Sequence, residues 1–317
     1  MTSSRNSLVI GTRGSKLSLV QTNYVVQILR QANPKIDIKI ATISTSPDIR
    51  DQAPLRSFQR GMFVKELELA LLDGRADIAV HSLKDLPTQM PHGLTIGAIS
   101  EREDPRDVLI SPNRAHLSDL PVAAVIGTSS SRRASQLRFL RRDLTIKPIR
   151  GNVDSRIQKM RDGQFDAIVV AAAGVSRLNR NDEVSQYFRT TELIPPPGQG
   201  ALAIETRSSD VWIQDLLKSV NHEPSEKAVT AERSFLAHLG GGCSVPVAAY
   251  AEIRANDLKI SGLICNENGD QRFSEEIIGS LTDPQALGIK LAKDLLDMGA
   301  MLSSKIFSLY VFEIASK

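Results

Sequence analysis

Apolar and polar positions in the first part of the chain follow two periods, one typical of strands and one typical of helices. Short apolar runs at residues 8–10 and 36–43 flank a helical pattern that ends near residue 31. A second helical pattern at residues 64–72 leads into a strand at 77–80. Because apolar spacing of three or four predicts amphipathic helices and short apolar runs predict strands, strands and helices alternate here. Such alternation favours α/β domains with parallel sheets.

The same order of elements occurs a second time. A strand that begins at residue 125 and ends before Gly127 is followed by a helix to about 142, a strand at 144–149, a helix at 153–160 and a strand at 166–171. Gly-Thr follows the first strand in both stretches, and Arg-Gly and Asp-Gly recur later at matching places. We therefore expect two similar domains that are joined twice, at residues 101–105 and 195–200. Residues 201–205 should return as a strand to the first domain.

The pattern changes after residue 221. A helix at residues 225–238 and a glycine loop at 240–243 precede three strand-like runs at 245–254, 258–265 and 272–278, and a helix at 283–296 follows them. Consecutive strands joined by short turns predict a small antiparallel α+β domain. The chain is thus expected to form domain 1 from residues 1–100 and 200–220, domain 2 from 105–195 and domain 3 from 221–317.

Composition excludes several classes of protein. With 41% hydrophobic and 24% charged residues, the 317-residue chain is typical of globular proteins and not of disordered ones. Aromatic residues make up only 4%, which argues against base-stacking surfaces for single-stranded nucleic acid. No apolar run approaches the about 18 residues of a membrane span, and the first residues lack the apolar core of a signal peptide. We expect a soluble, cytoplasmic protein.

Positive charge is concentrated in one region. The net charge is only +3, but residues 128–180 hold ten arginines and two lysines against four aspartates, a local charge of +8. Five of these arginines are expected on solvated helix faces: Arg138, Arg141, Arg142, Arg161 and Arg180. The other five lie at strand-to-helix turns or beside small polar residues, where the planar guanidinium suits a carboxylate or phosphate: Arg132, Arg133, Arg150, Arg156 and Arg177. Nucleic acid is the weaker candidate because the usual binding motifs are missing.

Two glycine-containing turns are candidate anion sites. Residues 11–15 (GTRGS) and 127–130 (GTSS) each follow a strand and precede a helix. Open α/β sheets bind ligands at the carboxyl ends of their strands, where helix N-termini offer unpaired N–H groups. Two such domains would form a cleft lined with anion-binding turns. A non-catalytic binding protein for an anionic solute therefore remains an alternative to an enzyme.

Asp85 is a candidate catalytic carboxylate. It follows a predicted strand and stands beside Lys84, whose charge would favour its ionised form. On local grounds, a helix-capping role just before Pro87 has about equal weight. His81 is expected to be a packed histidine.

The two cysteines differ in context. Cys243 follows three glycines, which leaves both a reactive thiol and a small buried residue open, whereas Cys265 lies in a strand pattern and should be buried. Two cysteines in so long a chain exclude a disulfide scaffold, and zinc binding is excluded because no second Cys or His stands at ligand spacing. His238 is near Cys243 in sequence only, which does not support a Cys–His protease.

Eight short motifs occur in the order found in one enzyme family. They are residues 11–15 (GTRGS), 63–68 (FVKELE), 81–87 (HSLKDLP), 127–133 (GTSSSRR), 149–156 (IRGNVDSR), 173–178 (AGVSRL), 198–201 (GQGA) and 241–246 (GGCSVP). Through these motifs the chain resembles the porphobilinogen deaminases, also called hydroxymethylbilane synthases, over nearly its whole length.

The resemblance implies a fold and a reaction. The family has two domains built like periplasmic binding proteins around a cleft and a third small α+β domain, with a three-stranded antiparallel sheet, that bears a cysteine. By its match, Cys243 would hold a dipyrromethane cofactor through a thioether. The enzyme joins four molecules of porphobilinogen with loss of ammonia and releases hydroxymethylbilane by hydrolysis, while the cofactor stays as a primer. The resemblance also favours a monomer without a nucleic-acid, membrane or metal partner.

The resemblance also implies roles for single residues. Asp85 matches the catalytic carboxylate, which would stabilise the cation left by loss of ammonia and transfer protons. Cofactor binding would fall to Lys84, Ser129, Ser130, Arg132, Arg133 and Arg156. Substrate binding would fall to Arg13, Ser15, Arg150, Arg156, Arg177 and Gln199. The arginines suit this task because every pyrrole unit carries an acetate and a propionate, which guanidinium groups bind through paired hydrogen bonds.

One segment departs from the family pattern. Residues 45–48 read TSPD, with proline where glycine is usual, and the following loop carries Arg56 and Arg60 where relatives often have lysine. The resemblance implies that this loop is a positively charged lid.

Overall fold

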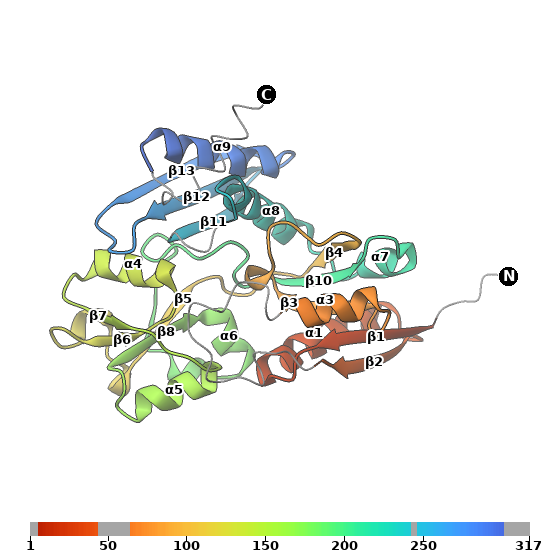
Figure 1. Cartoon of the computed structure of the whole chain (residues 1–317), viewed down its shortest axis with the longest axis horizontal. Coiled ribbons are helices and arrows are strands. Elements are labelled where there is room, and N and C mark those ends of the chain that lie inside the picture. Colours follow the sequence, from red (N-terminus) through yellow and green to blue (C-terminus); the bar gives the residue numbers. More distant parts are fainter. Residues whose placement is uncertain (1–5, 44–63, 242–245, 301–317) are drawn as a thin grey trace. The chain divides into compact units, whose positions relative to one another are not determined.

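The computed structural model describes residues 6–43, 64–241 and 246–300. These residues form two five-stranded sheets with flanking helices and one three-stranded antiparallel sheet, which confirms the expected fold class (Figure 1). No helix in the described ranges is both long enough and apolar enough to span a bilayer.

The chain divides into two compact units. One contains Met1–Glu103 and Gly200–Glu226, and the other contains Asp104–Gln199 and Lys227–Lys317. The chain therefore passes from one unit to the other near residues 103, 199 and 226. The expected separation of residues 105–195 from residues 221–317 as distinct domains stays a prediction.

The first unit contains a sheet of order β2-β1-β3-β10-β4. Its elements are β1 (Ser7–Thr12), α1 (Lys16–Ala32), β2 (Asp37–Thr42), α3 (Lys65–Leu72), β3 (Ile78–Ser82), the 3-10 turn η2 (Leu83–Asp85), β4 (Leu94–Ile99), β10 (Leu202–Arg207) and α7 (Val211–Leu217). Strands β1, β2 and β3 are parallel, whereas β10 is antiparallel to its neighbours β3 and β4. The predicted return of residues 201–205 to the first sheet is confirmed.

Apolar residues on both faces of this sheet explain its helical layers. Leu29 of α1 and Leu217 of α7 are fully buried with Ile204 of the sheet. On the opposite face, Leu67 and Leu71 of α3 pack with other buried apolar residues of the sheet. The strands are thus apolar on both faces, as expected of a sheet covered by helices on each side.

The second unit begins with a sheet of order β7-β6-β8-β5-β9. Its elements are β5 (Asp107–Ile110), β6 (Val125–Gly127), α4 (Ser131–Leu140), β7 (Thr145–Lys147), α5 (Val153–Arg161), β8 (Ala167–Ala171), α6 (Ala172–Arg177) and β9 (Gln186–Tyr187), with 3-10 turns at Pro112–Arg114, Leu117–Asp119 and Asn181–Glu183. Strands β6, β7 and β8 are parallel, and β5 is antiparallel to both β8 and β9.

The two sheets therefore have the same order of strand directions. Both contain parallel and antiparallel strands, whereas the sequence pattern predicts parallel sheets. Strands β5 and β10 follow directly after the chain passes from one unit to the other, so they enter without a crossover helix. Equivalent details support the repeat. The backbone N–H of Val9 donates to Asp77 Oδ2 at 2.9 Å, and that of Val125 donates to Asp166 Oδ2 at 2.7 Å.

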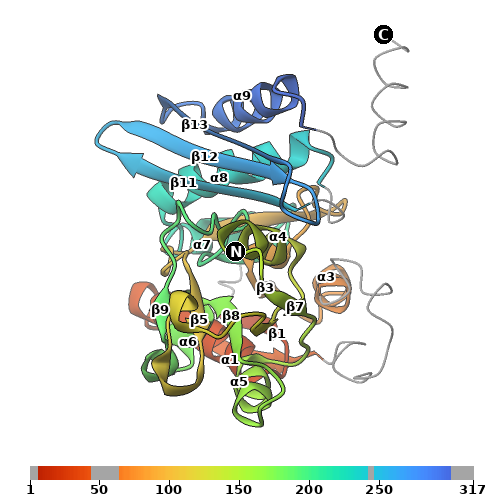
Figure 2. The same ribbon diagram turned by 90° about the vertical axis from the view of Figure 1, so that its left-hand side faces the viewer.

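The remaining sheet has the order β11-β12-β13 and is antiparallel throughout (Figure 2). Its elements are α8 (Glu223–His238), β11 (Val247–Arg254), β12 (Asp257–Cys265), β13 (Arg272–Ser280) and α9 (Pro284–Asp297). Phe235 of α8 and Leu291 of α9 are buried against Ile260 of β12. Cys265 is 4% exposed on the other face, beside Ile194, so its predicted burial is confirmed.

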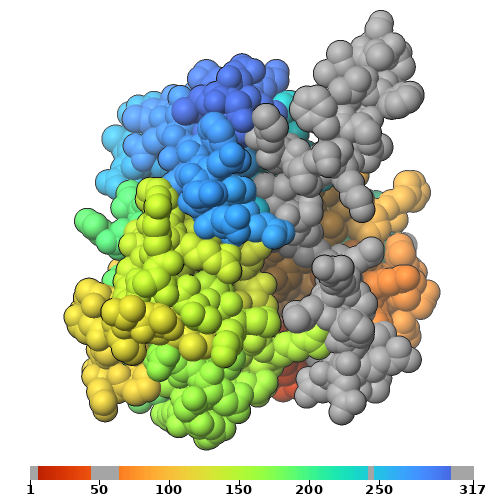
Figure 3. All heavy atoms as spheres, turned by 60° about the vertical axis from the view of Figure 1, so that its left-hand side comes forward, coloured from red at the N-terminus to blue at the C-terminus, as the bar shows by residue number. Residues whose placement is uncertain are grey.

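The turn between β12 and β13 packs on α4. A Cβ atom on Gly269, whose φ is +79°, would lie 2.2 Å from the backbone oxygen of Ser135, so only glycine fits. Arg138 donates from Nη1 to the backbone oxygen of Glu267 at 2.8 Å, and the guanidinium of Arg272 lies 4.6 Å from the ring centre of Phe139. Figure 3 shows this blue turn against the yellow-green surface of the second unit.

Candidate active site

Asp85 lies on a short turn whose neighbours are firmly packed. It is the last residue of η2 and its side chain is exposed, whereas Leu83 and Leu86 are buried. The backbone N–H of Leu83 donates to the oxygen of Ala201 at 3.0 Å, and that of Leu86 donates to Leu83 at 3.1 Å. Because Asp85 ends a 3-10 turn and does not precede a helix, the capping alternative is wrong. The turn presents a solvent-accessible carboxylate at the carboxyl end of β3.

Arg13 and Ser15 follow the neighbouring parallel strand, β1. Ser15 caps α1, since its Oγ accepts from the backbone N–H of Ser18 at 3.2 Å and lies 2.7 Å from Ser18 Oγ. Arg13 is partly buried just before this cap. The carboxyl ends of β1 and β3 are at the same edge of the sheet, so Arg13, Ser15, Lys84 and Asp85 belong to one edge.

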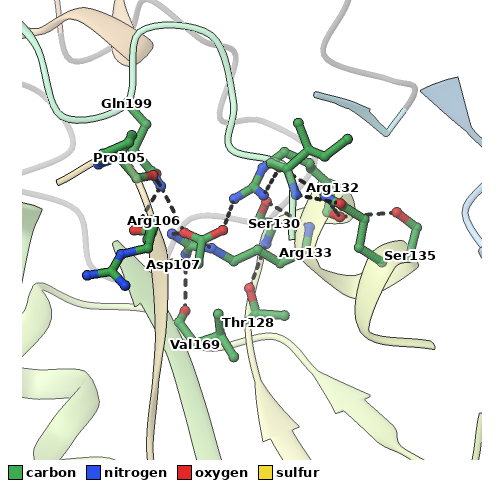
Figure 4. A network of polar contacts seen from close by, with 12 residues as sticks. Pro105, Arg106, Asp107, Thr128, Ser130, Arg132, Arg133, Ser135, Val169 and Gln199 are labelled. Carbon is green, nitrogen blue, oxygen red and sulfur yellow. Dashed lines mark hydrogen bonds and ion pairs between the residues drawn. The ribbon is translucent and has the colours of Figure 1, made fainter. Parts of the chain in front are cut away.

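A buried carboxylate holds two of the predicted anion-binding arginines in the second unit. Arg132 and Arg133, in the first turn of α4, are only 5% and 7% exposed, and Asp107 at the start of β5 is fully buried. Asp107 Oδ2 accepts from Arg132 Nη2 at 2.6 Å, and Oδ1 accepts from Arg133 Nη2 at 2.7 Å and Nε at 3.1 Å. Figure 4 shows the carboxylate between these groups. The two guanidinium groups thus share an internal counter-ion that sequence reasoning missed.

The pKa of Asp107 reflects these partners. Burial alone would raise the pKa, but the charges of Arg132 and Arg133 and the hydrogen bonds from Arg133 and Gln199 outweigh it and hold the pKa well below its usual range. Asp107 is therefore ionised at neutral pH, and the three side chains together carry one net positive charge.

Arg156 is a cation of a different kind. Its Nε donates to the backbone oxygen of Gly151 at 2.8 Å, and within the described residues it has no carboxylate partner. Burial, and then the charge of Arg133, lower the pKa of Arg156 to about 10. A partly desolvated guanidinium beside another cation lacks a counter-ion, so it fits a ligand with carboxylate groups.

The other polar residues of this region lie at the carboxyl ends of parallel strands. Ser129, after β6, donates from Oγ to the oxygen of Ile149 at 2.7 Å and accepts from its N–H at 3.0 Å. Ser130 caps α4 by accepting from the N–H of Arg133. Arg150 follows β7, and Arg177 ends α6, directly after β8. The structure thus brings the predicted residues of the second unit to one edge of its sheet.

Gln199 joins the two segments that lead into and out of this sheet. Its Nε2 donates to the oxygen of Pro105 at 2.7 Å and to Asp107 Oδ1 at 3.0 Å. The preceding residue, Gly198, donates its N–H to Glu232 Oε2 at 2.7 Å, and the other oxygen of Glu232 accepts from Ala251 at 2.7 Å. The side chain of Gln199 is therefore bonded to backbone and to Asp107.

The structure also shows the exposure of the five arginines expected on solvated faces and of His81. The five arginines expected on solvated faces are at least partly exposed, and three of them pair with a nearby carboxylate: Arg141 with Asp143, Arg161 with Glu183 and Arg180 with Asp154. His81 is 6% exposed, as expected.

Cys243, Arg56, Arg60 and the TSPD sequence at residues 45–48 lie outside the described residues. No group of three metal-binding side chains occurs among the residues that the structure describes.

Comparisons with known proteins identify two matching family models. Residues 8–215 match the family described as porphobilinogen deaminase, dipyromethane cofactor binding domain, and residues 227–297 match porphobilinogen deaminase, C-terminal domain.

Individual relatives agree with these models. The porphobilinogen deaminase of Brevibacillus brevis is 46% identical over 293 residues, covering 92% of this chain and 94% of that protein. The porphobilinogen deaminase of Thermus thermophilus is 43% identical over 293 residues, covering 92% of this chain and 96% of that protein. Among solved structures, the periplasmic VFT2 domain of Bordetella pertussis BvgS has a TM-score of 0.42 at 16% identity, covering 68% of this chain and 87% of that one.

Proposed function

Because the chain belongs to the porphobilinogen deaminase family, we propose that the residues at the two sheet edges described above bind and join porphobilinogen units. The protein is a transferase of tetrapyrrole synthesis with porphobilinogen as its substrate and dipyrromethane as its cofactor. It condenses four substrate molecules with loss of ammonia and releases hydroxymethylbilane. The observation that carries the assignment of residues is Arg156, a partly buried guanidinium whose Nε donates to the backbone of Gly151 and which lacks a carboxylate partner among the described residues.

The residues of the second unit fit the cofactor. Dipyrromethane, when bound, supplies the pyrrole carbon to which the first substrate unit is joined. Its acetate and propionate groups match the net positive charge of the Arg132, Arg133 and Asp107 cluster and the charge of Arg156. We also assign cofactor binding to Lys84, Ser129 and Ser130, with Cys243 as the attachment point. The hydroxyl of Ser129 is already bonded to Ile149 in both directions, so we expect it to position the loop.

Substrate binding is assigned to cations and polar groups at both sheet edges. Each porphobilinogen brings two carboxylates, which need several donors held in fixed directions. The proposed residues are Arg13, Ser15, Arg150, Arg156, Arg177 and Gln199. By the family resemblance, we also propose that Arg56 and Arg60 contribute positive charge to substrate binding.

Asp85 is proposed as the catalytic carboxylate. When substrate loses ammonia, a cation remains whose charge is shared with the pyrrole nitrogen. An accessible carboxylate on a fixed turn can accept a hydrogen bond from that N–H, stabilise the positive charge and take up the proton released when two rings are joined. The burial of Leu83 and Leu86 supports this role, because it limits movement of the turn.

The test is the intact mass of the purified protein together with an assay for hydroxymethylbilane. We expect a mass higher than that of the sequence by two linked pyrrole units, and formation of product from porphobilinogen. A protein with neither property would instead fit the anionic-solute binding protein considered from the sequence. A monomeric state and a cytoplasmic location stay predictions, and gel filtration tests the first.

A further inference from the structure

We propose that Asp107 is a positioning residue, which sets the direction in which Arg132 and Arg133 present their guanidinium groups to bound carboxylates. The inference rests on the proposed function, because the ligand role of the two arginines is part of it. Asp107 was not among the residues singled out in the sequence, and it reaches the ligand only through its neighbours.

Hydrogen-bond donors surround both oxygens of the Asp107 carboxylate. Asp107 is fully buried and accepts hydrogen bonds on both oxygens. Oδ1 accepts from Arg133 Nε and Nη2 and from Gln199 Nε2, while Oδ2 accepts from Arg132 Nη2 at 2.6 Å. A buried carboxylate with four donors around it has one favourable orientation, so the donors are fixed as well.

Each of the two guanidinium groups is held by a backbone oxygen as well as by Asp107. Arg133 Nη1 donates to the oxygen of Val169 at 3.0 Å, and Arg132 Nη1 donates to the oxygen of Ile194 at 2.7 Å (Figure 4). Asp107 occupies the Nε and Nη2 side of Arg133. A guanidinium has five N–H groups, and three of those of Arg133 donate to Asp107 and Val169, so one N–H on Nη1 and one on Nη2 remain for a ligand carboxylate.

Asp107 is also the counter-charge of a group of cations. Without it, Arg132, Arg133 and Arg156 would place three positive charges in a partly desolvated region, where burial, and then the charge of Arg133, already lower the pKa of Arg156. One internal carboxylate reduces this repulsion while leaving the region positive. Asp107 thus permits the arginines to be held close together without neutralising them.

The test uses three variants of the full-length, cofactor-loaded enzyme. Asp107→Asn keeps the shape and removes the charge, and Asp107→Glu keeps the charge and displaces it. Asp143→Asn is the matched control, because Asp143 also pairs with an arginine next to α4, Arg141, but is exposed. Because Arg132 and Arg133 are assigned to the cofactor, we expect the fraction of molecules that carry the two-pyrrole adduct to fall several-fold in both Asp107 variants, through loss of a well-directed charged hydrogen bond. The control should stay within about twofold of the unchanged enzyme.

The cofactor content of the folded protein separates positioning from a merely structural role. Loss of structure lowers the yield of soluble protein but leaves the adduct fraction of the folded molecules unchanged. Misdirected arginines should instead lower the fraction of folded, soluble Asp107→Asn protein that carries the adduct, which intact mass measures. If Asp107→Asn fails to fold, Asp107→Glu provides the test, because it keeps a negative charge beside Arg132 and Arg133.

Full cofactor loading in either soluble Asp107 variant would overturn the proposal. Failure of the proposed function gives a different result, namely an unchanged protein that carries no adduct and forms no product from porphobilinogen.

Discussion

His81 Nε2 lies 2.9 Å from Glu205 Oε2, with both side chains buried in the first sheet. His81 belongs to β3, four residues before Asp85, and Glu205 belongs to β10, the strand that returns late in the chain. A third ionisable group, Glu68 on α3, interacts with both of them electrostatically. The face of the sheet opposite α1 thus contains two carboxylates and one imidazole.

This cluster predicts a pH dependence of stability. Burial, and then the charge of Glu205, raise the pKa of Glu68. The folded state therefore binds more protons than the unfolded state between the ordinary pKa of a glutamate and the raised one, so stability falls as pH rises through that interval. We expect Glu68→Gln to be more stable than the unchanged protein at mildly alkaline pH and to show a flatter dependence, measured by urea unfolding.

A control of opposite sign is available. A hydrogen bond from Arg189 lowers the pKa of Glu192, so that carboxylate contributes stability above its ordinary pKa and loses it as pH falls. Glu192→Gln should therefore be less stable at mildly alkaline pH. Destabilisation by Glu68→Gln under the same conditions would show that burial does not disfavour the charged form of Glu68.

Replacement of the proposed catalytic carboxylate tests the mechanism. In Asp85→Asn, the exposed side chain keeps its shape but loses the charge that stabilises the cationic state of substrate. We expect kcat to fall at least ~100-fold with cofactor content and thermal stability retained. Asp73→Asn is the control, since Asp73 is an exposed carboxylate of the same unit that pairs with Arg75. Near-normal turnover of Asp85→Asn would remove Asp85 from the proposed role.

The two cysteines should differ in the mass of the purified protein. Burial raises the pKa of the Cys265 thiol, which makes it a poor nucleophile, and its Sγ contacts Ser135 Oγ at 3.1 Å. Cys265→Ala should therefore retain the two-pyrrole adduct, and Cys243→Ser should lack it. An adduct that persists in Cys243→Ser and disappears in Cys265→Ala would reverse the assignment.

Two arginines of helix α5 provide a test of anion binding. Arg156 lacks a carboxylate partner in the described part of the chain, whereas Arg161 on the same helix pairs with Glu183. We expect Arg156→Leu to raise KM for porphobilinogen roughly tenfold or more and Arg161→Leu to leave it nearly unchanged. Arg156→Lys should recover part of the loss, because it restores the charge but not the planar fork. Equal KM values for the two leucine variants would contradict the assignment.

Much of the fold follows from local patterns. The helices α1, α4, α5, α8 and α9 and the strands of the third sheet agree with apolar periodicity and turn residues. Strands β4, β5 and β9 were not expected. The four buried residues of β5 begin with an aspartate, and such a short run cannot be told from a loop without its partners β8 and β9.

Residues of the candidate site, too, could be predicted only where the local sequence suggests their chemistry. Asp85 and the arginines could be found because their residue types and neighbours suggest chemistry. Asp107 could not, since only the three-dimensional arrangement brings it to Arg132 and Arg133, 25 and 26 positions along the chain. The pairing of Glu205 with His81 could not be predicted for the same reason, because the two residues belong to strands more than a hundred positions apart.

The place of β10 has a consequence for folding during synthesis. Among the described strands, β4 pairs only with β10, which also completes the pairing of β3, so the first sheet cannot close until residues 202–207 have left the ribosome. The five strands of the second sheet all lie between residues 107 and 187. The second sheet can therefore complete its strand pairing before the first sheet, although it is translated later. Until residues 202–207 emerge, one edge of β3 has no partner strand.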